Sequence, residues 1–399
     1  MGFFKLNRVL LTMLFPLVIA ALPGVFRVLY MALAERSMTI KEFGEMNSDL
    51  SIASIFAFFT AVGVGSIVFA RSPKLGKSES MGFLNRVLRY TLYLLGLSVA
   101  VSILVYFMEG IFDLYSFLMF LCGWSIYQVL RNYFLSLKMY MSIVKLDCIL
   151  ICTFLCASFL LYKSNGVSLL FIFGFSYVFS GLIIHRWKIS KSLSRSDQKL
   201  VWRYGGVNFM SGAVYMAVIP FSGMLYGIEY AGIAGYLFSL VNVLVLLPRA
   251  MSNYFMPAFS IGKEMESKYN KFSILVLLSL IFSFSIIYFI FSGVHGYILN
   301  GSWAGIDVIS VFEVILLSVF CQQLSLIPSS LISSREKTVF MLILNFIFLL
   351  LSAFLFVFEM NNRTLGFNNL MLYLAYLSLI RYVFLELYSR IYLNRMEFN

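Results

Sequence analysis

Long uncharged runs of apolar residues restrict this chain to very few folds. Phe340 to Phe358 contains no charged residue, and Val9 to Ala20 is a second run of this kind. A helix needs roughly 20 apolar residues to cross a bilayer, whereas a strand of a membrane barrel has about 10 residues of alternating polarity. The runs in this chain are long and nearly continuous, so they predict membrane-spanning helices.

The composition points the same way. The chain is 61% hydrophobic and only 12% charged, with a mean hydropathy of +0.91. A soluble domain carries about 25% charged residues. We therefore predict an all-α polytopic membrane protein with about 12 transmembrane helices. The expected segments are Val9–Tyr30, Phe43–Ala70, Leu84–Phe107, Phe112–Leu137, Ile143–Tyr162, Val167–His185, Gly205–Tyr226, Ala231–Phe259, Phe272–Phe291, Ile306–Ser333, Val339–Phe358 and Asn368–Ile391. The first run is read as a helix, not a signal peptide, because no clean cleavage site follows it.

The distribution of Lys and Arg predicts the orientation. With a cytoplasmic N-terminus, 22 of the 30 basic residues fall in cytoplasmic loops or helix ends, 5 fall on the outer side and 3 lie within spans. Basic residues accumulate on the cytoplasmic side of membrane proteins. The net charge of +12 is therefore a topology signal, and no nucleic-acid partner is expected. We expect a multi-pass protein with both termini in the cytoplasm.

The longest hydrophilic stretch lies near the middle of the chain. It is the basic segment 186–203, which would be a cytoplasmic linker between an N-terminal six-helix lobe, 1–185, and a C-terminal six-helix lobe, 204–399. Six is an even number, so both halves would enter the membrane in the same direction, as parallel repeats do. We predict two parallel lobes around a central cavity.

Four arginines are the candidate substrate-binding residues. Arg131, Arg249 and Arg381 fall within predicted spans, and Arg27 lies near the outer end of the first. A charge within a span is costly and marks a function or a structural pair. A guanidinium fork matches phosphate oxygens, so a cavity lined by these residues would suit a phosphate-bearing substrate. The alternatives are that each arginine reaches the headgroups or pairs with a carboxylate.

Three acids are candidates for coupling transport to H⁺ or Na⁺, namely Asp49, Asp307 and Glu313. The alternative is that each pairs with a nearby cation or lies at the interface. Asp147 follows Lys145 closely and is expected at the cytoplasmic rim. Gln322 and Gln323 are candidate sugar-facing groups, and Gly63 and Gly65 are expected to permit close helix packing.

The sequence contains no nucleophile–base set, no Gly-rich phosphate loop and no nucleotide-binding segment. Cys148, Cys152 and Cys156 recur every four residues, but cysteine is a small apolar packing residue and neither of the two histidines lies near them. We expect a transporter with no cofactor and no metal, not an enzyme.

Two stretches carry a family resemblance. Phe43-Gly44, followed by a helix with Gly63 and Gly65 and closed by Arg71, is one of them. The other is 230–236, Tyr-Ala-Gly-Ile-Ala-Gly-Tyr, with Leu247-Pro248 and Met256-Pro257 after it. Together with Pro23 and Arg27, the length and the central basic loop, they resemble the Wzx-type O-antigen and polysaccharide flippases of the multidrug, oligosaccharidyl-lipid and polysaccharide exporter superfamily.

The resemblance implies a MATE-like fold, a place in the bacterial inner membrane and a role in lipopolysaccharide or polysaccharide biosynthesis. The expected substrate is an undecaprenyl-pyrophosphate-linked oligosaccharide, an O-antigen or capsule repeat unit, moved by alternating access through a cationic cavity. A polysaccharide polymerase and a chain-length regulator are implied partners. Two alternatives stay open, namely an ion-coupled exporter of drugs or small molecules with the same fold, and an O-antigen polymerase. The polymerase is less favoured because such enzymes usually carry a large periplasmic loop.

Overall fold

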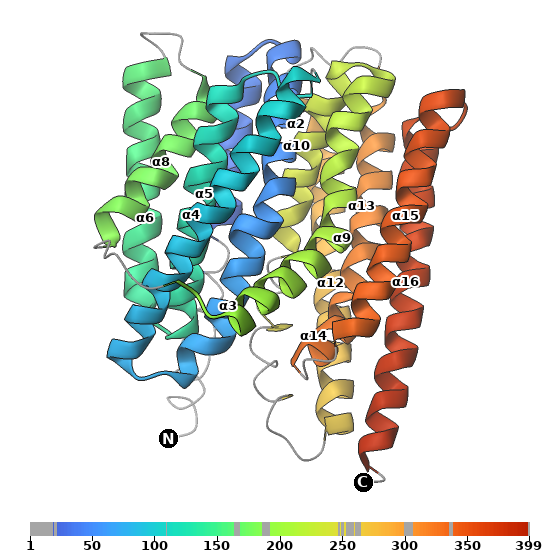
Figure 1. The fold of residues 1–399 in the computed structure, drawn as a ribbon. Helices are drawn as coiled ribbons and strands as arrows, with labels where there is room; N and C mark the ends of the chain where they lie inside the picture. The colour runs from blue at the N-terminus through green and yellow to red at the C-terminus, as the bar shows by residue number, and fades with distance from the viewer. Residues whose placement is uncertain are drawn as a thin grey trace, which may run out of the picture. The chain divides into compact units, whose positions relative to one another are not determined.

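The computed structural model of the chain is helical (Figure 1). It describes residues 19, 22–108, 110–162, 168–185, 192–245, 248, 251–252, 259, 265–298, 306–334 and 338–397. Within these ranges there is no strand, and helical structure is found at each of the 12 predicted segments. The all-α prediction is therefore confirmed.

The chain divides into two compact units, which are described separately. The internal unit is Glu42–Pro220, and the split unit joins Met1–Lys41 to Phe221–Asn399. These units do not follow the lobes predicted at 1–185 and 204–399. The division into two sets of six helices therefore stays a prediction.

In its described residues, the internal unit contains six apolar helical segments. The first of them is not a regular α-helix, because α2 passes through a π-helical segment, η1, into α3 and a 3₁₀ turn, η2. The elements are α2 Ile40–Ala57, η1 Phe58–Gly63, α3 Val64–Arg71, η2 Ser72–Lys74, α4 Lys77–Phe107, α5 Leu114–Ser136, α6 Tyr140–Ala157, the π-helical η3 Ser158–Tyr162, α8 Leu169–Ile184 and α9 Arg195–Tyr226, whose last residues belong to the split unit.

Glycines allow the helices of the internal unit to approach closely. A Cβ atom on Gly63 would lie 2.8 Å from Cα of Gly205, so η1 and α9 meet backbone to backbone. A Cβ on Gly65 would overlap the Asn132 side chain on α5. Small residues serve this purpose between membrane helices. The packing role predicted for Gly63 and Gly65 is confirmed.

The split unit begins, within the described residues, with a helix over 22–37. The other elements are α10 Ile228–Leu244, α12 Met265–Ile298, α13 Val308–Leu324, α14 Leu326–Ser334, α15 Thr338–Asn362 and α16 Gly366–Glu397. The segment predicted as one helix over Ile306–Ser333 is thus interrupted at Ser325. Pro328 explains the interruption, because it has no N–H to donate to the Leu324 carbonyl four residues earlier.

A buried carboxylate closes the turn between α15 and α16, which lie side by side (Figure 1). Glu359 is fully buried and accepts hydrogen bonds from the backbone N–H groups of Thr364, Leu365 and Gly366 at 3.1, 2.9 and 3.1 Å. The Tyr226 hydroxyl donates a further hydrogen bond to it at 2.8 Å. These bonds satisfy the backbone donors at the start of α16, which would otherwise lack partners.

The central basic segment is more helical than the sequence analysis assumed. Of the predicted linker 186–203, residues 186–191 lie outside the described residues, and Arg195 to Arg203 are the first turns of α9. The N–H of Asp197 donates to the Ser194 hydroxyl at 3.2 Å, and that hydroxyl donates to the Asp197 carboxylate at 2.7 Å. Ser-x-x-Asp before a helix is a capping pattern, and it was the sequence signal for this start.

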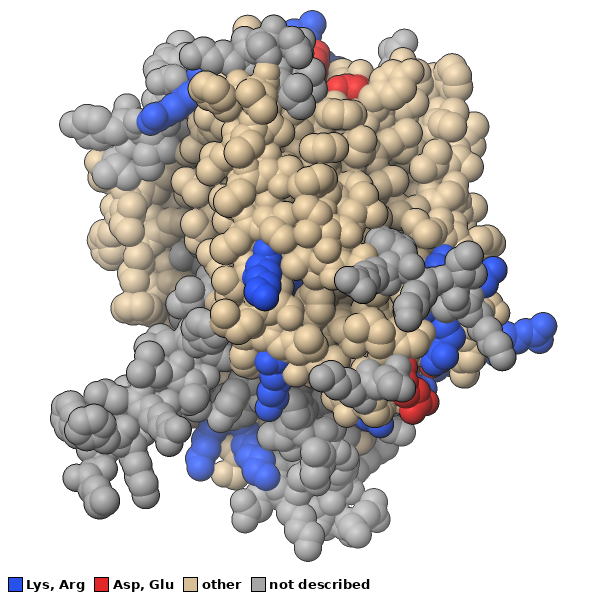
Figure 2. All heavy atoms as spheres, turned by 90° about the vertical axis from the view of Figure 1, so that its left-hand side faces the viewer, with Lys and Arg blue, Asp and Glu red and all other residues tan. Residues whose placement is uncertain are grey.

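Eight helices in the described residues are long and apolar enough to cross a membrane. Large apolar side chains such as Leu104, Phe159 and Phe354 are exposed, as expected where lipid covers a surface. Figure 2 shows one face of the molecule, on which a broad uncharged area separates charged side chains near the top from others in the lower part. The chain is therefore a multi-pass membrane protein.

Candidate functional site

The four predicted arginines cannot be described together as one site. Arg249 lies outside the described residues. Arg27 and Arg381 belong to the split unit, whereas Arg131 belongs to the internal unit. Each is therefore considered within its own unit, and their common cavity stays a prediction.

Arg381 lies beside the interruption between α13 and α14. It is 4% exposed, and its Nη2 donates a hydrogen bond of 2.5 Å to the Ser325 hydroxyl at the interruption. Its guanidinium also lies 4.7 Å from the centre of the Phe348 ring on α15. The Ser325 hydroxyl in turn donates to the Gln322 carbonyl at 2.6 Å. Three helical elements thus position this cation.

The position of Arg381 in its helix is informative. It is separated from both ends of the span Gly366–Leu393 by roughly 18–22 Å along the helix axis. It therefore lies near the middle of the span, where a permanent charge is most costly. Transporters of several folds place substrate and ion sites near the bilayer midplane, beside interrupted helices. Arg381 is buried within the protein, and its role in substrate binding stays a prediction.

The amides of Gln322 and Gln323 lie directly before Ser325. The Gln323 side chain is 6% exposed and donates to the Gln322 side-chain oxygen at 3.4 Å. Guanidinium, hydroxyl and amide groups together can donate several hydrogen bonds to the oxygens of a phosphate or a sugar. We call Gln322, Gln323, Ser325 and Arg381 the Arg381 cluster.

Arg131 has a different environment, because a carboxylate neutralises it. Its Nε lies 3.8 Å from the Asp147 carboxylate on α6, and the two residues are 7% and 2% exposed. The Tyr127 hydroxyl donates to the same carboxylate at 2.5 Å, and its ring packs on Tyr177 of α8 with centroids 4.8 Å apart. Asp147 is thus buried against Arg131, and its expected place at the cytoplasmic rim stays a prediction. The alternative of pairing with a carboxylate therefore describes Arg131.

Arg27 lies in the helix over 22–37 and is half-buried. The helix continues to Ser37, beyond the end predicted at Tyr30, so Arg27 lies about 15 Å before the end of the helix and not near it. Its assignment to substrate binding stays a prediction.

Among the candidate coupling acids, Asp49 has a clear structural role. It is 1% exposed, and its carboxylate accepts hydrogen bonds from the backbone N–H groups of Phe112 and Asp113 at 2.9 and 2.8 Å. Asp113 in turn caps α5 by accepting from the Ser116 N–H at 3.2 Å. Asp49 thus holds the start of α5 against α2.

Replacing Asp49 with alanine is expected to destabilise the internal unit by about 1–3 kcal/mol, because two buried N–H groups lose their acceptor. Asp49→Asn keeps one acceptor oxygen and should cost less. Thermal unfolding of the purified protein in lipid nanodiscs measures both, with Glu45→Ala on the same helix as control. If stability is unchanged while transport loses its ion dependence, coupling and not capping is the role of Asp49.

The other two acids lie in or beside α13. Asp307 is its exposed N-cap and accepts from the Ser310 N–H at 3.2 Å. Glu313 is exposed and accepts from the Tyr288 hydroxyl at 3.2 Å. Both positions fit the alternative of interfacial exposure, and ion coupling stays a prediction for them.

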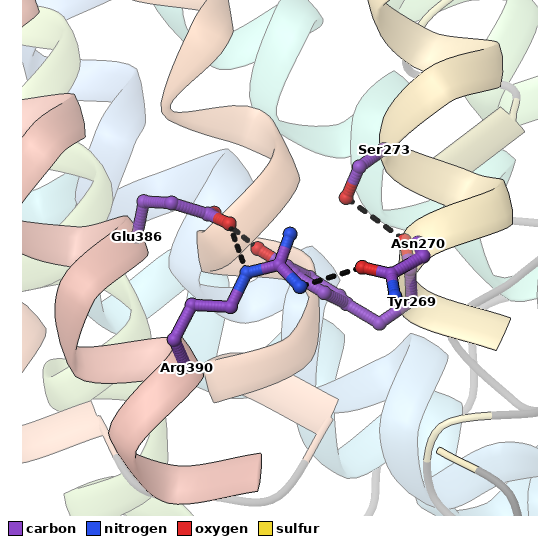
Figure 3. Close-up of polar contacts among 5 residues, drawn as sticks. All are labelled: Tyr269, Asn270, Ser273, Glu386 and Arg390. Carbon is purple, nitrogen blue, oxygen red and sulfur yellow. Dashed lines mark hydrogen bonds and ion pairs between the residues drawn. The ribbon is translucent and has the colours of Figure 1, made fainter. Parts of the chain in front are cut away.

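One polar cluster was missed by the sequence analysis (Figure 3). Arg390 near the end of α16 donates to Glu386 at 2.8 Å and to the Asn270 side chain on α12 at 2.5 Å. The Tyr269 hydroxyl donates to Glu386, and the Arg390 guanidinium lies 5.1 Å from the centre of the Tyr269 ring. Glu386 and Arg390 are four residues apart, a spacing that pairs side chains on a helix. The cluster ties the start of α12 to the end of α16.

In the part of the chain that the structure describes, no group of three or more His, Cys, Asp or Glu residues could hold a metal ion. Cys148, Cys152 and Cys156 are exposed along α6.

No family model matches the chain, and no curated protein matches it. Solved structures do match. An outward-facing conformation of a multidrug resistance MATE family transporter of the MOP superfamily has a TM-score of 0.70 at 13% identity, covering 96% of this chain and 94% of that one. The inward-facing conformation of such a transporter has a TM-score of 0.68 at 13% identity, covering 95% of each chain.

A third similar structure is that of a MOP superfamily transporter from Pyrococcus furiosus, for which reverse polarity of the binding pocket suggests a different function. Its TM-score is 0.65 at 13% identity, with 96% of this chain and 94% of that chain covered. These similarities span nearly the whole of both chains. The protein therefore has the MATE-like fold that the sequence predicted, the fold of MOP superfamily transporters.

Proposed function

We propose that this protein is a flippase that moves an undecaprenyl-pyrophosphate-linked oligosaccharide, an O-antigen or capsule repeat unit, from the inner to the outer leaflet of the bacterial inner membrane by alternating access. The observation that carries the proposal is Arg381, a buried cation near the middle of a membrane span in a transporter fold. It is supported by the resemblance of the sequence to Wzx-type flippases.

The physical argument concerns the pyrophosphate. An isolated ion in a medium of low dielectric constant costs tens of kcal/mol by Born estimates, so the charge needs a cation along its path. The Arg381 guanidinium supplies one, with a fork that fits two phosphate oxygens. Gln322 and Gln323 would offer amide groups to sugar hydroxyls.

The remaining assignments are parts of the same proposal. Arg27 and Arg249 would extend the cationic path, and Arg131 would contribute once its ion pair with Asp147 opens. Coupling to H⁺ or Na⁺ would use a carboxylate among Asp49, Asp307 and Glu313. Both termini would lie in the cytoplasm, and a polysaccharide polymerase and a chain-length regulator would receive the product.

An ion-coupled exporter of drugs is the second candidate, since similar structures include multidrug resistance transporters. A cationic drug would be repelled by Arg381, which is the reason for ranking this function lower. The neighbour described as having a binding pocket of reversed polarity is a precedent within the fold for a different function.

The test is deletion of the gene in its host, followed by analysis of surface polysaccharide and of lipid-linked intermediates. The proposal expects that the deletion strain loses surface glycan and accumulates the lipid-linked repeat unit in the inner leaflet. Expression of the full chain in that strain should reverse both changes. Intact surface glycan together with raised drug sensitivity would instead identify a drug exporter.

A further inference from the structure

The helices α12 and α13 pack against each other in opposite directions. Three contacts define their register. The rings of Phe291 and Phe312 stack with centroids 4.1 Å apart. The Tyr288 hydroxyl lies 3.2 Å from the Glu313 carboxylate. The rings of Phe284 and Phe320 meet edge to face at 5.3 Å.

A groove of about 480 Å³ lies between these two helices. Its walls are mostly apolar and include Ile281, Phe284, Leu317 and Phe320. Its polar groups are Ser285, Tyr288 and Glu313. Ile281 is 48% exposed and Phe289, which also lines the groove, is 73% exposed, so the groove opens onto an exposed apolar surface, as a lipid-covered surface is.

The polar and apolar parts of the groove lie at different depths. Glu313 is about 8 Å along the helix axis from the start of α13 at Val308, and the Tyr288 hydroxyl contacts it from α12. Phe320 is about 18 Å from the same helix start, and the Phe284 ring meets it from α12. The groove is therefore polar near the headgroup region and apolar toward the middle of the bilayer, as an amphiphilic molecule is.

Glu313 needs a counter-charge in this position. A carboxylate on a lipid-covered surface is costly unless a cation accompanies it. In the described part of the chain, no Lys or Arg nitrogen lies within 4.0 Å of its oxygens, and its one hydrogen-bond donor there is the Tyr288 hydroxyl. Glu313 is exposed and lines the groove.

We propose that this groove binds a membrane phospholipid with a primary ammonium headgroup, such as phosphatidylethanolamine. The ammonium donates hydrogen bonds to Glu313, and one acyl chain lies along Phe284, Leu317 and Phe320. The charge of Glu313 selects an ammonium over an anionic headgroup, and the number of N–H donors selects it over a choline headgroup. This site does not depend on the proposed flippase function.

The full-length protein is placed in nanodiscs of phosphatidylglycerol with 30% phosphatidylethanolamine, and the lipids that it retains are counted by native mass spectrometry. The expected result is preferential retention of phosphatidylethanolamine over phosphatidylglycerol and over phosphatidylcholine tested at the same fraction. Glu313→Gln should lower that preference about tenfold, because it removes a charge-assisted hydrogen bond. Glu266→Gln in the first turn of the same α12 is the matched control and should retain the wild-type preference.

A second variant, Leu317→Trp, fills the apolar part and keeps the carboxylate. It should lower total lipid retention at the site. The proposal is overturned if Glu313→Gln, eluting as a folded monodisperse protein, retains phosphatidylethanolamine as the wild type does, or if phosphatidylglycerol is the lipid retained. Because no transport is measured, neither outcome bears on the flippase proposal.

Discussion

Replacing Arg381 with alanine is expected to lower translocation by about a hundredfold or more. The fork of Arg381 can form two charge-assisted hydrogen bonds to a phosphate, each worth about 1.5–3 kcal/mol, and 1.4 kcal/mol is a factor of ten. Arg381→Lys keeps the charge but loses the fork, and an intermediate loss of about tenfold is expected. The measurement is the arrival of lipid-linked oligosaccharide in the outer leaflet.

The Arg381 variants need two controls. The amount of folded protein in the membrane must match the wild type, because removing a buried group also affects stability. Arg36→Ala, at an exposed arginine of the helix over 22–37, removes the same side chain where no substrate contact is proposed and should transport normally. Full translocation by a well-folded Arg381→Ala protein would remove this residue from the proposed path.

Replacing Asp147 with asparagine is expected to destabilise the protein by about 3–5 kcal/mol, because Arg131 would stay buried without a neutralising carboxylate. The matched control is Asp197→Asn in the ion pair with Arg71, also in the internal unit. That pair has a similar separation, 3.7 Å, but its side chains are 49% and 18% exposed, so about 1 kcal/mol or less is expected. Thermal unfolding in nanodiscs compares the two variants.

The double variant Arg131→Met/Asp147→Leu then separates a structural role from a transport role. Apolar side chains of similar volume commonly replace a buried ion pair without loss of stability. The double variant should therefore recover most of the lost stability, less about 1–3 kcal/mol for the buried Tyr127 hydroxyl, which loses its acceptor. If translocation returns as well, Arg131 serves the fold alone. If the protein is stable but inactive, Arg131 handles substrate. A single Asp147→Asn variant as stable as Asp197→Asn would contradict the buried ion pair itself.

The sequence predicted the helices well because apolar length is a one-dimensional property. It placed the ends of the spans less well. The helix predicted from Phe272 begins at Met265, since polar residues continue a helix beyond the lipid and hydropathy does not detect them. The start of α9 was likewise missed, although the Ser194 and Asp197 capping pattern was visible.

The sequence indicated which arginines are buried but not what they contact. Arg381 and Arg131 fall within predicted spans, and both side chains are buried in the structure. Their environments depend on which helices pack together, and that information is not in the local sequence. Asp147 was expected at the rim because of Lys145, and the local sequence did not indicate that helix packing would place it against Arg131. Pro328 was a visible signal for the interruption beside Arg381, because proline removes one helical hydrogen bond.

The carboxylate that closes the turn between α15 and α16 has a consequence for biogenesis. Glu359 binds backbone groups only five to seven residues further along the chain. Toward the other ends of the same helices, the rings of Phe340 and Tyr388 stack with centroids 4.2 Å apart. Local contacts form quickly. The two helices can therefore enter the bilayer together as a hairpin whose backbone donors are already satisfied at the turn.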